Sequence, residues 1–138
     1  MNSPNQYYLY STSNSCLLAA DCPIGTFASS TTKTCSSCNS ACTACFGSST
    51  NCSSCVTGPT QYFLISSTFT CVLSTGCPAG RYADTSTSIC QSCNSSCLTC
   101  SGSPNNCITC LITPIPYYFY SANTSCILPA SCPVGTFA

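Results

Sequence analysis

The sequence predicts a small, disulfide-rich fold, organised as a tandem array of repeats with short β-hairpins and little or no helix. Three observations lead to this prediction. The chain has 18 cysteines among 138 residues, above the level that marks disulfide scaffolds. All of them follow one register of 55 residues. No window shows the apolar period of an amphipathic helix. We therefore expect an elongated rod in which covalent links replace a large apolar core.

The repeat extends beyond the cysteines. CPIGTFA at position 22 recurs as CPAGRYA at 77 and CPVGTFA at 132. CSSCNSACTAC at 35–45 recurs as CQSCNSSCLTC at 90–100. Both ends of the chain fall inside a repeat, which predicts a segment of a longer array. The expected organisation is the C-terminal part of a first repeat at 1–22, full repeats at 22–77 and 77–132, and the start of another at 132–138.

Each repeat is expected to contain one hairpin. The aromatic stretches YYLY at 7, YFLI at 62 and YYFY at 117 are typical of strands. Each leads through a Ser-, Thr- and Asn-rich turn to a second short apolar stretch, which indicates a two-stranded hairpin. The cysteine-dense stretches between these hairpins lack a strand pattern, so we expect irregular loops there.

Composition excludes several classes of function. Lys33, Arg81, Asp21 and Asp84 are the only charged side chains, and the chain has no histidine. Nucleic acid is not an expected partner, because no basic patch is present to neutralise phosphates. The apolar runs are too short for a membrane-spanning helix, and residues 1–15 do not resemble a signal peptide.

The cysteines admit three interpretations. Zinc would suit the C-x2-C pairs, but no histidine is available and each repeat would leave two cysteines unused. Redox catalysis would need a thiol activated by a helix end or a cation, and both are scarce here. Structural disulfides match dense cysteine with little core, and they are typical of oxidising compartments. The residues favour disulfides.

The spacing C-x2-C-x3-C-x2-C-x6-C-x2-C, followed by an aromatic hairpin and C-P-x-G-x-[FY], resembles the furin-like, growth-factor-receptor cysteine-rich repeat. R-spondins have a similar module. The Ser-, Thr- and Ala-rich filling also resembles the cysteine-rich surface antigens of ciliates. This second resemblance implies a protist protein.

The furin-like resemblance implies a pairing of sixteen cysteines. Cys16 and Cys132 are left over, and each is expected to find a partner outside the segment or in a neighbouring chain. The implied pairs are Cys22–Cys35, Cys38–Cys45, Cys42–Cys52, Cys55–Cys71, Cys77–Cys90, Cys93–Cys100, Cys97–Cys107 and Cys110–Cys126.

No catalytic, cofactor-binding or metal-binding residues are predicted. Asp21 and Asp84 occupy unrelated repeat positions and are interpreted as surface residues. Serine nucleophiles lack a histidine base, and two distant acids are too few for calcium.

The hairpin aromatics are interpreted either as packing residues or as an interaction surface. Strand alternation divides them between a face that covers the disulfides and a face open to a partner. The residues of this predicted surface are Tyr62, Phe63, Tyr117, Tyr118, Phe119 and Tyr120.

Covalent glycans are the other expected addition, because a nearly uncharged surface tends to associate. Asn94 and Asn123 are the preferred N-linked acceptors, and Asn51 precedes a cysteine expected to be bonded. The aligned Ser/Thr runs are the first choice for O-linked sugar. They comprise Ser29, Ser30, Thr31 and Thr32, and then Thr85, Ser86, Thr87 and Ser88.

The sequence therefore predicts an extracellular or cell-surface structural protein, without enzymatic activity, that forms part of a coat, stalk or filament. Its expected partners are copies of itself or further repeats of the same chain. The alternative is the ectodomain of a receptor, adhesin or surface antigen that binds protein or carbohydrate through exposed aromatics.

Overall fold

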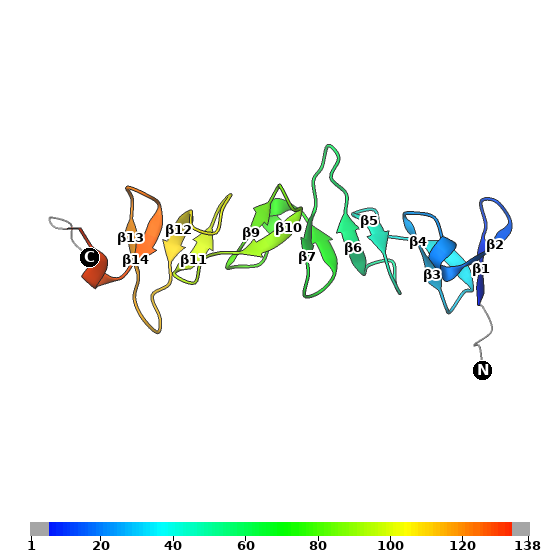
Figure 1. Cartoon of the computed structure of the whole chain (residues 1–138), viewed down its shortest axis with the longest axis horizontal. Coiled ribbons are helices and arrows are strands. Elements are labelled where there is room, and N and C mark those ends of the chain that lie inside the picture. The colour runs from blue at the N-terminus through cyan, green and yellow to red at the C-terminus, as the bar shows by residue number, and fades with distance from the viewer. Residues whose placement is uncertain (1–5, 134–138) are drawn as a thin grey trace. The chain divides into compact units, whose positions relative to one another are not determined.

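The computed structural model describes residues 6–133, whose backbone is a succession of short strands (Figure 1). The described residues contain three single-turn 3-10 helices and no α-helix, and none of their helices has the length and apolar character needed to span a membrane. The strands are β1 (Tyr7–Tyr10), β2 (Ser15–Leu18), β3 (Thr26–Ser29), β4 (Thr34–Ser37), β5 (Cys42–Cys45), β6 (Cys52–Cys55), β7 (Phe63–Ile65), β8 (Thr70–Val72), β9 (Arg81–Asp84), β10 (Ile89–Ser92), β11 (Cys97–Cys100), β12 (Cys107–Cys110), β13 (Tyr118–Tyr120) and β14 (Ser125–Ile127). The 3-10 turns are Ala19–Asp21, Ser74–Gly76 and Pro129–Ser131.

The chain divides into two compact units, Met1–Leu73 and Ser74–Ala138. In the first unit, four strands form a sheet in the order β2-β1-β4-β3. Its two hairpins are antiparallel, and β1 meets β4 in parallel, where the Leu9 N–H donates to the Lys33 carbonyl at 2.8 Å. The hairpins β5–β6 and β7–β8 follow.

The second unit repeats the last three hairpins of the first unit in the same order. It contains the antiparallel hairpins β9–β10, β11–β12 and β13–β14. Their pairings correspond to those of β3–β4, β5–β6 and β7–β8, one repeat earlier. The predicted class, a strand-rich and disulfide-rich repeat fold, is therefore confirmed. The repeat boundaries stay a prediction, and residues 1–5 and 134–138 of the predicted terminal portions lie outside the described residues.

The three aromatic hairpins are confirmed as β1–β2, β7–β8 and β13–β14. The expectation of irregular loops in the cysteine-dense stretches is wrong, because β3–β4, β5–β6 and their repeats form there. In β5–β6, Cys42 lies opposite Cys55 and Cys45 lies opposite Cys52, with an irregularity between them. The Cys42–Cys52 bond joins these two strands covalently. The ladder can therefore form without the apolar alternation that usually identifies a strand.

Sulfur makes up most of the interior. Nine of the eleven buried hydrophobic residues in the described part of the chain are cysteines, and the others are Tyr8 and Phe63. In the second unit, Cys97, Cys100, Cys107 and Cys126 form one cluster, against which Tyr82 and Tyr117 pack. The described residues bury no polar or charged side chain. The fold thus depends on cross-links, because it has few apolar side chains to bury.

The hairpin turns also repeat in backbone conformation. Asn14, Phe69 and Thr124, at equivalent positions, have φ of 51°, 54° and 53°. Of these three residues, only the asparagine is of a type that adopts this left-handed region readily. The Phe69 carbonyl accepts a hydrogen bond from the Cys52 N–H at 2.7 Å, and the Thr124 carbonyl accepts one from the Cys107 N–H at 2.7 Å. Tertiary contacts therefore impose a conformation that Phe69 and Thr124 would not favour alone.

The CP-x-G turn leads to a first prediction, because Gly25 and its equivalent Gly80 both have a positive φ. Gly25 has φ of 85°, and a Cβ built there would meet nothing within 4 Å. Gly25→Ala should therefore cost about 1–2 kcal/mol of unfolding free energy, from backbone conformation alone. Chemical denaturation of the oxidised chain measures this cost. Gly58, whose φ is not in the left-handed region, is the matched control, and Gly58→Ala should change stability by less than about 0.5 kcal/mol. Equal effects of the two substitutions would contradict the prediction.

Candidate functional site

The structure joins sixteen cysteines in eight disulfides, and it pairs them as the furin-like resemblance implies. Their Cα–Cα distances run from 5.3 to 5.7 Å, within the usual range. The pairs are Cys22–Cys35, Cys38–Cys45, Cys42–Cys52, Cys55–Cys71, Cys77–Cys90, Cys93–Cys100, Cys97–Cys107 and Cys110–Cys126. Peptide mapping of the oxidised protein is the experiment that would establish this pairing chemically.

Two disulfides come together in each unit. The Sγ atoms of Cys42, Cys52 and Cys71 all lie within 4.8 Å of one another, and so do those of Cys97, Cys107 and Cys126. The sequence did not reveal these sulfur clusters, because Cys71 lies far along the chain from Cys52. All six sulfurs belong to disulfides. They therefore do not offer the thiolates that zinc requires.

Cys16 and Cys132 are the free cysteines of the described residues. Cys16 is exposed on β2, opposite Leu9 of β1, and Cys132 is partly exposed after the last 3-10 turn. That each of them forms a disulfide with a cysteine outside the segment or in a neighbouring chain stays a prediction.

The structure divides the predicted aromatic surface. Tyr118 and Phe119 are exposed, at 38 % and 49 %, whereas Tyr117 packs on the sulfur cluster of the second unit. Tyr62 and Tyr120 are half-buried. Phe63 is only 3 % exposed, so the prediction that it belongs to an interaction surface is wrong, and its side chain is part of the interior.

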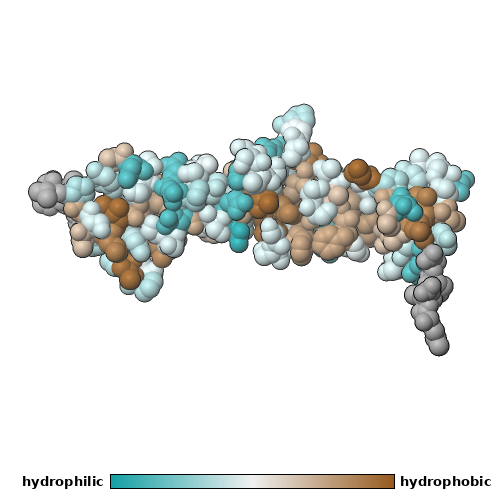
Figure 2. Space-filling model, viewed as in Figure 1, coloured by the Kyte–Doolittle hydropathy of each residue, from teal (hydrophilic) through white to brown (hydrophobic). Residues whose placement is uncertain are grey.

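Other exposed apolar side chains were missed in the sequence. Leu98, Ile108, Ile112 and Ile115, here called the aliphatic set, are exposed by 47 to 70 % in the second unit. Figure 2 shows apolar side chains gathered on the loop between β12 and β13, which carries Ile112 and Ile115. The 55-residue register would have revealed the set, since the equivalent residues of the first unit are all hydroxyl-bearing. They are Thr43, Ser53, Thr57 and Thr60.

The predicted glycan acceptors lie mainly at the surface. Asn94 and Asn123 are exposed and Asn51 is half-buried. The first Ser/Thr run begins at Ser29, the last residue of β3, and continues into the turn before β4, whereas the second run lies in the turn between β9 and β10. Ser29 and Ser88 are half-buried, and the other residues of the two runs are exposed: Ser30, Thr31, Thr32, Thr85, Ser86 and Thr87.

The two acidic side chains belong to different units, Asp21 to the first and Asp84 to the second. The Ser86 hydroxyl (2.6 Å) and the Thr87 hydroxyl (2.8 Å) donate to the Asp84 carboxylate, which lowers its pKa. Asp84 thus organises the β9–β10 turn, as aspartate commonly does.

Comparison with known proteins identifies one similar curated protein. A stretch of 92 residues, 66 % of this chain, is 36 % identical to proprotein convertase subtilisin/kexin type 6 of Rattus norvegicus. The chain spans only 9 % of that protein's length. No family model matches the chain, and no solved structure matches it. The local similarity and the eight disulfides fit a furin-like cysteine-rich repeat and indicate a secreted or extracellular domain.

Proposed function

We propose that the chain is an extracellular structural protein whose furin-like repeats, at 22–77 and 77–132, form part of a cell-surface coat, stalk or filament. The observation that carries the proposal is the sulfur interior: within residues 6–133, nine of the eleven buried hydrophobic residues are cysteines. Such an interior resists heat and proteases without needing a large core. The proposal includes no enzymatic turnover, because the chain has no histidine to act as a general base.

Self-association is part of the proposal. Only four side chains are charged and their sum is zero, so like-charge repulsion does not keep copies apart. Exposed apolar side chains such as Tyr7 (55 %), Phe119 (49 %) and Leu9 (40 %) offer contact area on the hairpins. Glycans on Asn94, Asn123 and the Ser/Thr runs would limit this association to chosen faces.

One observation favours the alternative, a binding ectodomain. The aliphatic set is exposed in the second unit and replaced by hydroxyl residues in the first. A surface required for stacking identical repeats has no reason to differ between them, whereas a surface for a separate partner does. That partner would be a protein with an apolar patch of its own.

Analytical ultracentrifugation of the oxidised chain separates these functions. Assembly predicts a sedimentation coefficient that rises steeply with concentration, and fibres in electron micrographs. Phe119→Asp should reduce assembly severalfold, because association would bury an unpaired carboxylate in the contact between copies. The control replaces the aliphatic set with its counterparts (Leu98→Thr, Ile108→Ser, Ile112→Thr, Ile115→Thr), and it should assemble like the parent. A chain that stays monomeric at its highest soluble concentration would remove the structural proposal and favour the ectodomain.

A further inference from the structure

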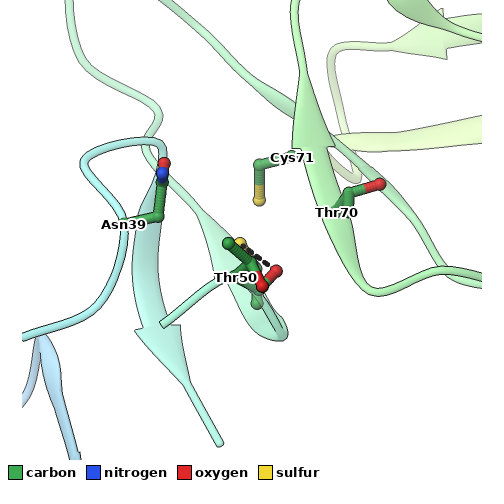
Figure 3. A pocket seen from close by; sticks show the side chains of 5 residues that line it. Asn39, Thr50, Thr70 and Cys71 are labelled. Atoms are coloured by element: carbon green, nitrogen blue, oxygen red, sulfur yellow. Dashed lines mark hydrogen bonds between the residues drawn. The ribbon is translucent and has the colours of Figure 1, made fainter. Parts of the chain in front are cut away.

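A small cavity of about 130 Å³ lies in the first unit, beside the sulfur cluster (Figure 3). Cys52 and Cys71 line it, so it gives access to sulfurs of two different disulfides. Its other lining residues are Asn39, Thr50 and Thr70. Figure 3 shows the Cys71 side chain pointing from its strand toward Thr50. The cavity therefore brings solvent to a disulfide sulfur.

The two sulfurs differ in accessibility. Cys52 is only 2 % exposed, whereas Cys71 is partly exposed. Asn39 and Thr50 are themselves exposed, which places the mouth of the cavity at the surface. A reagent entering from solvent should meet Cys71 Sγ before Cys52 Sγ.

The second unit has the same sulfur cluster with a different covering. Asn105 stands where the first unit has Thr50, and the Asn94 side-chain amide donates to the Asn105 side-chain oxygen at 3.0 Å. Cys126, the counterpart of Cys71, is buried and only 7 % exposed. The shorter Thr50 side chain instead contacts the hydroxyl of Ser48 at 3.3 Å. In the second unit, the hydrogen bond between Asn94 and Asn105 thus joins the two positions that are equivalent to Asn39 and Thr50 at the mouth of the cavity in the first unit.

We propose that the cavity is an exchange site at which a small thiol, of about the size of cysteine, modifies Cys71. The thiol loses its proton to solvent, and its sulfur attacks Cys71 Sγ. A new sulfur–sulfur bond forms to Cys71 as the Cys55–Cys71 bond breaks, and the electron pair leaves on Cys55 Sγ, which takes up a proton. No outside oxidant is consumed, because one disulfide is exchanged for another.

The surroundings favour a reversible modification. Cys55 is only 6 % exposed, and its Cα lies 5.7 Å from that of Cys71. The released Cys55 thiol therefore stays beside the modified Cys71, where it can attack Cys71 Sγ and expel the small thiol again. The cavity lining contains no charged residue, so size rather than charge selects the thiol. The site is independent of the proposed coat function, because it needs only the folded repeat.

Limited exchange with L-cysteine tests this inference. The free Cys16 and Cys132 are first blocked by alkylation, and the oxidised chain is then incubated with L-cysteine. The reaction is quenched with acid, new thiols are alkylated with a second reagent, and the peptides are mapped by mass spectrometry. Cysteinylation should appear on Cys71 and the new alkyl group on Cys55. This should occur roughly tenfold faster than the corresponding reaction at Cys126 and Cys110.

Two reciprocal variants control the experiment without touching a cysteine. Thr50→Asn copies the covering of the second unit and should slow modification of Cys71 to the rate seen at Cys126. Asn105→Thr removes that covering and should speed modification of Cys126 severalfold. Equal rates at Cys71 and Cys126 in the parent chain would overturn the proposal. So would a first adduct on Cys52, or rates that neither variant changes.

Discussion

Complete reduction of the eight disulfides should unfold the chain entirely, even in the absence of denaturant. Each bond closes a loop of 7 to 16 residues and contributes about 2–3 kcal/mol by restricting the unfolded state. Eight such bonds contribute on the order of 20 kcal/mol, which exceeds the net stability of about 5–15 kcal/mol typical of whole domains. The few buried aromatic side chains are too small a reserve to compensate.

Nuclear magnetic resonance measures this directly. The oxidised chain should give a dispersed amide spectrum, and the reduced and alkylated chain should give the narrow spectrum of an unfolded polypeptide. The control receives the alkylating reagent without reductant, so that only Cys16 and Cys132 react. Dispersion that persists after verified reduction would show that burial, rather than cross-linking, maintains the fold.

The loss of unfolding free energy on deleting a single disulfide should depend more on how deeply that disulfide is buried than on the length of the loop that it closes. Cys42→Ala with Cys52→Ala should cost about 4 kcal/mol, whereas Cys38→Ala with Cys45→Ala should cost about 2 kcal/mol. The two loops have similar sequence separations, 10 and 7 residues, so their entropic contributions are nearly equal. Cys42 and Cys52 are 6 % and 2 % exposed, whereas Cys38 and Cys45 are half-buried. Deleting the first pair therefore also leaves a cavity inside the sulfur cluster.

Denaturant titration of the two double variants gives both free energies of unfolding. The equivalent pair in the second unit, Cys97→Ala with Cys107→Ala, serves as an internal replicate, because these residues are 5 % and 3 % exposed. Equal costs for the buried and half-buried pairs would mean that the disulfides act only through the unfolded chain.

These results also bear on the proposed biology. A chain stabilised by local cross-links can be lengthened by adding repeats, since each repeat carries its own disulfides. This is a useful property in a coat or stalk. The exchange site at Cys71 concerns one covalent bond of this framework, and its test does not depend on whether the chain assembles.

The sequence alone determined the repeat step, the three aromatic hairpins and the near absence of charge. A strand–turn–strand pattern is visible within about twenty residues, and the repeat step is visible by comparing segments of the sequence that lie 55 residues apart. Through a family resemblance it also implied the pairs that the structure joins, although spacing by itself does not select a pairing.

Only the tertiary structure decided where strands form in the cysteine-dense stretches, and which apolar side chains reach solvent. Phe63 and Tyr118 occupy equivalent positions, yet the first is 3 % exposed and the second 38 %. Likewise, Cys52 and Cys71 line one cavity although they are distant along the chain. The physical reason is that exposure and proximity depend on which segments the covalent bonds bring together, and sequence spacing measures distance only along the backbone.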